Sequence, residues 1–304
     1  MNKGIYRIAA GVGAAVILVS SATAQAATVT ANGTPAPVAS DSIAGWPAAP
    51  AVTSETAVLI DADTGAVLYD KGMDEYRYPA STTKIMTMLV AIENSSPKDI
   101  VTFTETGIRD VTWDSSNINA QLGETMTMKD CWFAAYIKSA NEVCAQIAEY
   151  VGGTEANFVE MMNQEALELG ATNTHFANPS GLQDENHYTT VYDLYLIFNA
   201  AIKDDRFVNY ISTKKYTTSY TDASGAQVDQ VWVNTNGYLK GTYDMPENVT
   251  VIGGKTGTTE AAGSCLVLYS ESQDKKPYIS IVLKGNSKKE LYTLMTELLT
   301  NYSN

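Results

Sequence analysis

The chemistry in this sequence of 304 residues centres on a serine and a lysine three positions apart, Ser81 and Lys84, in the stretch YPASTTKIMTMLVAIE. On a helix, side chains three residues apart lie on one face, within reach of a shared hydrogen bond. A lysine that heads an otherwise apolar segment is costly to bury in its charged form, so its pKa should fall. A neutral amine beside a hydroxyl can accept the hydroxyl proton, so Ser81 is a candidate nucleophile and Lys84 its base.

The position of Ser81 suits this chemistry. It follows Pro79 and Ala80, and the first turn of a helix leaves backbone N–H groups without partners. A negative charge that forms there is stabilised by those donors and by the helix dipole. If Ser81 were only a helix cap, the lysine in the apolar segment would be unexplained; a surface lysine is the other simple alternative.

Two further motifs follow along the chain, Ser139-Ala-Asn141 and Lys255-Thr256-Gly257. Ser139 and Asn141 are two apart and cannot share a helix face, so they should occupy a turn between helices, although capping is the ordinary use of both residue types. The segment VIGGKTGTT predicts a strand that ends at a cleft. There Lys255 supplies a local cation suited to a carboxylate, and Gly257 leaves room for a peptide beside the strand edge. Protection of an edge strand is the alternative use of Lys255.

Together and in this order, the three motifs resemble the signature set of penicillin-binding proteins and class A β-lactamases. From about Glu55 to Leu299 the chain resembles a low-molecular-mass penicillin-binding protein, a serine-type D-alanyl-D-alanine carboxypeptidase of the peptidase S11 family. The segments THFANPSGL, HYTTVYDL and AGSCLV also resemble patterns of that family.

The resemblance implies a role for each motif residue. Ser81 is the acylated nucleophile and Lys84 the proton acceptor, Ser139 relays a proton to the leaving amine, and Asn141 orients Lys84 and binds the substrate backbone. The substrate-binding strand residues are Lys255, Thr256, Gly257 and Thr258; Thr256 hydrogen-bonds the substrate, and the backbone N–H groups of Thr258 and Ser81 form an oxyanion hole.

The same resemblance implies the partners of the enzyme. We expect a peptidoglycan stem peptide that ends in D-alanyl-D-alanine as substrate, β-lactam antibiotics as covalent inhibitors, and neither a cofactor nor a metal. Relatives commonly carry an arginine after the last strand to hold the substrate carboxylate, whereas GNSKKE offers only Lys288 and Lys289. D,D-endopeptidase action on peptidoglycan cross-links therefore stays open as an alternative to carboxypeptidase action.

Three other functions are less well supported. A class A β-lactamase carries a deacylating carboxylate in an E-x-x-L-N segment, and no such segment lies between the second and third motifs; the acidic stretch NQEALELG reads as the surface of an amphipathic helix. A non-catalytic β-lactam sensor would not need the base Lys84. A Ser-His-Asp arrangement would use His175 or His187, but both lie in polar, loop-like stretches.

The elements that must position these residues follow from periodicity. Residues 55–70 predict a hairpin, residues 128–139, 141–152 and 155–170 predict helices, and strand character returns over 231–284. Residues 288–302 predict an amphipathic helix with an inner side formed by Leu291, Leu294, Met295, Leu298 and Leu299. This order predicts an α+β fold of the penicillin-binding protein and β-lactamase-like transpeptidase type, with an antiparallel sheet from both chain ends and an inserted helical lobe.

The net charge and the number of cysteines limit which partners and cross-links the chain can have. A net charge of −14 argues against a nucleic-acid partner, because phosphate binding needs a basic face. The odd cysteine count argues against a disulfide framework, so Cys131, Cys144 and Cys265 are expected to be buried and unpaired. We expect a monomer.

The N-terminal part reads as targeting and tether sequence. Residues 1–26 combine a short basic region, an apolar stretch and an A-x-A site, which predicts an export signal; a retained membrane anchor is the alternative. Residues 27–50, rich in Ala, Pro, Thr and Ser, predict a flexible linker. Residues 51–304 then form the catalytic domain of a protein exported to the cell-wall side of the membrane. The C-terminal anchor and extra β-rich domain of several relatives are expected to be absent.

Overall fold

The computed structural model describes residues 55–111 and 115–303. The predicted signal segment 1–26 and linker 27–50 lie outside the described residues. The strands are β1 Thr56–Asp61, β2 Val67–Lys71, β3 Ile100–Thr102, β4 Thr125–Thr127, β5 Lys215–Thr221, β6 Gln227–Val233, β7 Val249–Thr259, β8 Gly263–Ser272 and β9 Pro277–Gly285. The helices are η2 Ala80–Thr83, α1 Lys84–Asn94, α2 Thr106–Arg109, α3 Met128–Phe133, η3 Ala134–Lys138, α4 Asn141–Gly152, α5 Glu155–Glu168, α6 Val191–Ala201, α7 Asp205–Ser212, α8 Gly237–Lys240 and α9 Lys288–Tyr302.

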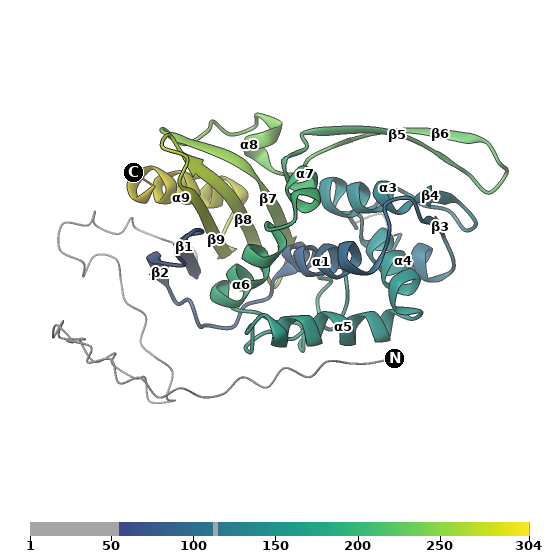
Figure 1. Ribbon diagram of the computed structural model, residues 1–304, viewed down its shortest axis with the longest axis horizontal. Coiled ribbons are helices and arrows are strands. Elements are labelled where there is room, and N and C mark those ends of the chain that lie inside the picture. The colour runs from purple at the N-terminus through teal and green to yellow at the C-terminus, as the bar shows by residue number, and fades with distance from the viewer. Residues whose placement is uncertain (1–54, 112–114, 304) are drawn as a thin grey trace, which may run out of the picture. The chain divides into compact units, whose positions relative to one another are not determined.

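The main sheet is built from both ends of the chain, as the sequence predicts. Its strand order is β2-β1-β9-β8-β7, and every pairing is antiparallel. The first strand pairs directly with the last, with Val58 opposite Ile281. The strand that carries the third motif, β7, is therefore an edge strand, and it faces the helical region (Figure 1).

Two apolar cores hold the sheet in place. The smaller lies between the sheet and α9. The five inner residues that periodicity predicts, Leu291, Leu294, Met295, Leu298 and Leu299, are all buried, and Tyr292 and Tyr302 of the same helix are buried with them. The larger fills the space between the other face and the inserted helices, and it includes most of α1. Cys131, Cys144 and Cys265 are buried and unpaired, as expected. No helix among the described residues is both long and apolar enough to span a membrane.

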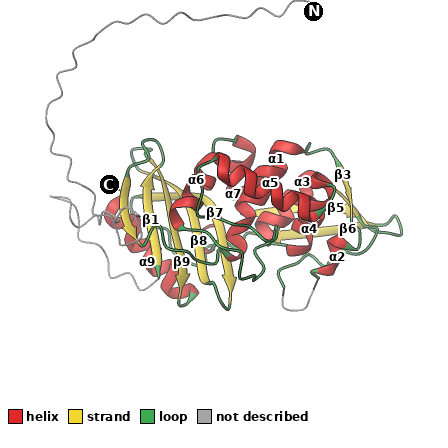
Figure 2. Cartoon of the chain, turned by 90° about the horizontal axis from the view of Figure 1, so that it is seen from below, coloured by secondary structure: helices red, strands yellow, loops and turns green. Residues whose placement is uncertain are grey.

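A second, four-stranded sheet of order β3-β4-β5-β6 was not predicted. It lies at the other end of the helical region from the main sheet (Figure 2). Strand β5, KYTTSYT, is polar and has a single fully buried residue, so its sequence carries little apolar alternation. Buried Trp232 and Tyr220 anchor the β5–β6 hairpin, and the chain leaves β6 directly toward the cleft described below.

Candidate active site

The nucleophile candidate lies on a tight turn that leads into α1. Ser81 is in the 3-10 turn η2, and Lys84 is the first residue of α1. The Thr82 hydroxyl donates to the Pro79 carbonyl at 2.7 Å and fixes the start of the turn. The Lys84 Nζ and Ser81 Oγ atoms are 3.1 Å apart, the predicted contact between base and nucleophile.

Lys84 is fully buried, and its amine has three polar neighbours. Besides Ser81, the Nζ atom lies 2.7 Å from Asn141 Oδ1 and 2.6 Å from the Ser180 carbonyl oxygen. Burial lowers the pKa of Lys84, although the nearby Cys144 and Glu142 oppose the shift. A neutral amine has two N–H donors and one lone pair; the two accepting oxygens take the donors, so the lone pair faces the Ser81 hydroxyl.

The second motif lies in a turn between helices, as its spacing predicts. Ser139 follows the π-helical turn η3 and has a φ of +62°, which breaks the helix, and Asn141 opens α4. The Asn141 backbone N–H donates to the Ser116 carbonyl at 2.8 Å. This turn thus brings the Asn141 side chain to Lys84 and holds the segment that carries Ser116.

Lys255 is more enclosed than the sequence suggests. Only 1% of its surface is exposed, and its Nζ donates to Ser139 Oγ and to the Thr256 carbonyl, both at 2.9 Å. Burial, and then the charge of Lys84, lower the pKa of Lys255 well below its usual range. The amine thus bridges the second and third motifs. Its predicted role of facing a substrate carboxylate stays a prediction.

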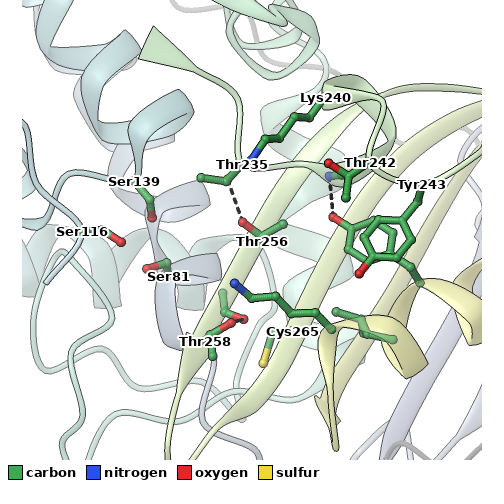
Figure 3. Close-up of a pocket in the computed structure, with 15 residues that line it drawn as sticks. Ser81, Ser116, Ser139, Thr235, Lys240, Thr242, Tyr243, Thr256, Thr258 and Cys265 are labelled. Carbon is green, nitrogen blue, oxygen red and sulfur yellow. Dashed lines mark hydrogen bonds between the residues drawn. The ribbon is translucent and has the colours of Figure 1, made fainter. Parts of the chain in front are cut away.

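The third motif packs directly on the nucleophile turn. A Cβ atom at Gly257 would lie 3.0 Å from both the Pro79 carbonyl oxygen and the Ser81 backbone nitrogen, so a larger residue there would press on the nucleophile turn. On the same strand the Thr256 hydroxyl donates to the Thr235 hydroxyl at 2.7 Å. Ser81, Ser116 and Ser139 lie along one side of the resulting cleft, and Thr256 and Thr235 face them from the other (Figure 3).

A loop over residues 178–187 supplies contacts that the motifs do not reveal. The Asn178 side-chain oxygen accepts from the backbone N–H groups of Ser180, Gly181 and Leu182, which fixes the Ser180 carbonyl against Lys84. His187 lies behind the site: its Nε2 atom is 2.7 Å from Thr83 Oγ1, and burial lowers its pKa to about 4. His187 is therefore neutral and contacts Thr83, with no hydrogen bond to Ser81 among the described contacts.

A buried carboxyl group next to Asn141 was also not predicted. The Glu142 side chain is fully buried and accepts a hydrogen bond from the Ile118 N–H at 2.7 Å. Its Oε2 atom is buried without a partner among the described residues. Burial raises the pKa of Glu142 to about 7, against the backbone hydrogen bonds that lower it.

The cleft has a volume of about 260 Å³ and contains further residues that sequence reasoning missed. Ser116 and Thr235 come from connecting segments. Lys240 and Lys288 supply cations, and Tyr243 and Tyr292 stack with ring centroids 4.0 Å apart. The sequence indicates Lys288 as a candidate for holding the substrate carboxylate, whereas Lys240 belongs to no motif. No Asp or Glu belongs to the lining within the described part of the chain.

The fold and this serine–lysine cleft define a penicillin-binding protein of the active-site serine class. The chain belongs to the peptidase S11 family, described as D-alanyl-D-alanine carboxypeptidase, which it matches over residues 44–287. All three motifs lie within the matched range.

Curated relatives agree with this assignment. The chain is 36% identical over 250 residues to D-alanyl-D-alanine carboxypeptidase DacF of Bacillus subtilis, covering 81% of this chain and 61% of that protein. It is 32% identical over 244 residues to D-alanyl-D-alanine carboxypeptidase DacA of Haemophilus influenzae, covering 77% and 58%. The chain thus spans about three fifths of the length of these two relatives.

Solved structures show the same fold. The crystal structure of the Streptomyces K15 DD-transpeptidase matches with a TM-score of 0.78 at 28% identity, covering 84% of this chain and 99% of that one. Penicillin-binding protein 5 of Haemophilus influenzae matches with a TM-score of 0.74 at 29% identity, covering 83% and 71%. These likenesses support the predicted sheet from both chain ends with helices between.

Proposed function

We propose that this protein is a serine-type D-alanyl-D-alanine carboxypeptidase that removes the terminal D-alanine of peptidoglycan stem peptides. The observation that carries the proposal is the Lys84 amine, buried, with its pKa lowered, and held 3.1 Å from Ser81 Oγ. Family membership and relatives named for this activity support the choice of substrate.

The reaction proceeds through an acyl-enzyme. Ser81 Oγ attacks the carbonyl carbon of the penultimate D-alanine while its proton passes to Lys84 Nζ. The peptide C–N bond then breaks, and the leaving amine takes a proton by way of Ser139, whose hydroxyl contacts Lys255. Water next attacks the Ser81 ester, which returns the hydroxyl and releases the shortened peptide. The backbone N–H groups of Ser81 and Thr258 stabilise the oxyanion in both steps.

Substrate binding is assigned to β7 and the rim of the cleft. The peptide lies along the edge of β7 beside Gly257, with Thr256 and Asn141 as hydrogen-bonding partners. The terminal carboxylate faces the Lys255 side of the cleft, where the exposed Lys240 and Lys288 supply further positive charge in a strongly acidic protein. The predicted export signal is consistent with action on the cell wall, outside the cytoplasmic membrane.

Release of D-alanine from a synthetic acyl-D-alanyl-D-alanine peptide tests the function. The wild-type protein should release D-alanine, and Ser81→Ala should reduce kcat by several orders of magnitude with unchanged folding. Thr82→Ser, a conservative change at the next residue, serves as the control and should retain activity. A folded wild-type protein that releases no D-alanine would favour a β-lactam sensor.

Transfer of the acyl group to an amine is a second candidate. It is favoured by the likeness to the solved DD-transpeptidase, because the same Ser81 ester can react with an amine or with water. Adding glycine or a diamino acid to the assay separates the two outcomes, since transfer yields a new peptide bond and hydrolysis does not. A β-lactamase is disfavoured because no carboxylate lines the described cleft to activate a deacylating water.

A further inference from the structure

A second cavity, here called the tyrosine cavity, lies near the catalytic cleft. Its volume is about 560 Å³, within the range of about 300 to 1,000 Å³ found for small-molecule sites. It is lined by Glu55, Tyr76, Arg77, Tyr78, Glu185, Tyr188, Ala261 and Lys284. The lining combines three aromatic rings with charges of both signs, a composition unlike that of an apolar packing defect.

The walls of the tyrosine cavity and of the cleft are in contact. Tyr78 lines the cavity three residues before Ser81, and its carbonyl oxygen lies 3.9 Å from the sulfur of Cys265, which lines the cleft. Glu185 comes from the same loop that fixes Ser180 against Lys84. Ala261 lies in the turn that follows β7. A molecule that extends past the end of β7 would therefore reach the cavity.

Lys284 is brought into this cavity by a bulge in β9. Between the pairs Ser264–Gly285 and Leu266–Val282, β8 advances two residues and β9 advances three. Lys284 itself has a φ of +66°, which costs a non-glycine residue about 1 kcal/mol. In a regular strand, where side chains alternate between the two faces, Lys284 would lie on the same face as Val282, toward α9. The bulge places it on the side of Tyr78 instead.

The charge of Lys284 is available to a ligand. Its Nζ donates to the Ala261 carbonyl, and no ion pair joins it to a carboxylate of the described residues. Arg77 differs, because Glu55 and Glu75 already neutralise it. Among the described residues that line the cavity, Lys284 is thus the cation without an ion pair, and a carboxylate is the group that it would bind.

The aromatic groups form an accessible surface beside that cation. Tyr76 is 57% exposed, and its ring meets the edge of Tyr188 with centroids 5.2 Å apart. Tyr188 in turn lies 5.9 Å from the ring of His175. Rigid rings with a polar tip suit the flat apolar face and the hydroxyl groups of a sugar.

We propose that the tyrosine cavity binds the glycopeptide end of the peptidoglycan substrate, with an N-acetylated amino sugar on the tyrosines and a carboxylate of the attached peptide at Lys284. This inference rests on the proposed function, which makes the substrate a peptide attached to a sugar. An extended peptide spans about 3.3 to 3.6 Å per residue, so five residues reach about 17 Å from a terminus held in the cleft. That length is enough to join two cavities whose walls are in contact.

Binding of muramyl dipeptide, which carries the sugar and a free carboxylate but no D-alanyl-D-alanine, tests the site directly. Calorimetry should detect binding to the wild-type protein, with and without penicillin on Ser81. Tyr76→Leu and Lys284→Gln should each weaken binding by about fivefold or more. The matched controls are Tyr150→Leu, another exposed tyrosine, and Lys275→Gln, another lysine with positive φ, and both should bind normally.

Kinetics supply a second readout. Wild-type kcat/KM should be higher for a muramyl pentapeptide than for the free pentapeptide. Tyr76→Leu should remove this preference while leaving the free pentapeptide unaffected, whereas Lys284→Gln should lower kcat/KM for both substrates, because both carry the peptide carboxylate. The inference is overturned if muramyl dipeptide does not bind, if the sugar-free dipeptide binds equally well, or if both variants bind normally. Failure of the proposed function would look different, because neither pentapeptide would be cleaved. The binding of muramyl dipeptide would still show whether the tyrosine cavity is a binding site.

Discussion

At the scale of single residues, the site depends on which groups form hydrogen bonds with the buried amine of Lys84. Lys84 has two accepting oxygens, on Asn141 and Ser180, and one hydroxyl neighbour, Ser81. The sequence predicts the contact with Ser81 from helical spacing alone. It cannot predict Ser180, because that carbonyl comes from a loop 96 residues away whose position depends on packing.

Removal of the base gives the first prediction. Lys84→Ala should reduce acylation by peptide and by penicillin roughly 100- to 10,000-fold, since no other amine of the described residues hydrogen-bonds Ser81. Wild-type activity should also fall as the pH drops through the lowered pKa of Lys84, because the ammonium form cannot accept a proton. Stopped-flow acylation across pH measures both effects. Lys98→Ala, at an exposed position, is the control, and an active Lys84→Ala enzyme would refute the assignment.

The buried carboxyl of Glu142 gives a prediction about stability. Its pKa is about 7 in the folded protein and about 4.5 when unfolded, so between these values the folded state binds more protons. Stability from this group is therefore present below about pH 4.5 and lost as the pH rises through 7. The loss amounts to about 3 to 4 kcal/mol at most.

Urea unfolding at pH 5 and pH 8 measures this effect. In Glu142→Gln the difference in unfolding free energy between the two pH values should shrink by up to that amount, while Glu160→Gln, on an exposed side chain, should behave as wild type. The negative charge of Glu142 also raises the pKa of Lys84. The pH below which activity is lost should accordingly be lower in Glu142→Gln than in the wild type. An unchanged pH dependence would show that Glu142 does not affect the pKa of Lys84.

At the scale of elements, the spacing of residues along the chain predicts the turns and helices whose form depends on neighbouring residues. The turn at Ser139 follows from two residues that cannot share a helix face, and the helix α9 follows from its apolar period. The polar hairpin of β5 and β6 lacks such a pattern, so neither it nor the cleft residue Thr235 just beyond it was predicted. The contribution of Lys240 likewise depends on how α8 packs.

The loop over residues 178–187 gives a prediction at this scale. Gly181 has a φ of +82°, and a Cβ there would lie 1.9 Å from the Ala80 carbonyl oxygen, beside the nucleophile. Gly225 has a φ of +87° with no atom within 4 Å of such a Cβ, so it is a matched control. Gly225→Ala should cost about 1 kcal/mol, whereas Gly181→Ala should cost at least twice as much and reduce kcat/KM at least tenfold. Equal effects in unfolding and activity assays would contradict the close packing.

At the scale of the whole molecule, the fold brings together motifs that are far apart in the chain. The sheet joins β1 to β9 and leaves β7 at its edge, and the inserted helices carry the serine motifs to that edge. The sequence predicts this architecture because strands lie at both ends and helices between them. It does not predict the tyrosine cavity, which depends on a bulge in β9 and on segments that meet only in the folded protein.

Mass spectrometry after incubation with a penicillin tests the central claim most directly. The proposed mechanism predicts a covalent adduct with the mass of the intact drug on the peptide that contains Ser81, formed by the wild-type protein and absent from Ser81→Ala. Addition of an acyl-D-alanyl-D-alanine peptide should slow adduct formation, because both ligands need the same serine. A folded wild-type protein with no adduct, or an adduct on another residue, would contradict the account.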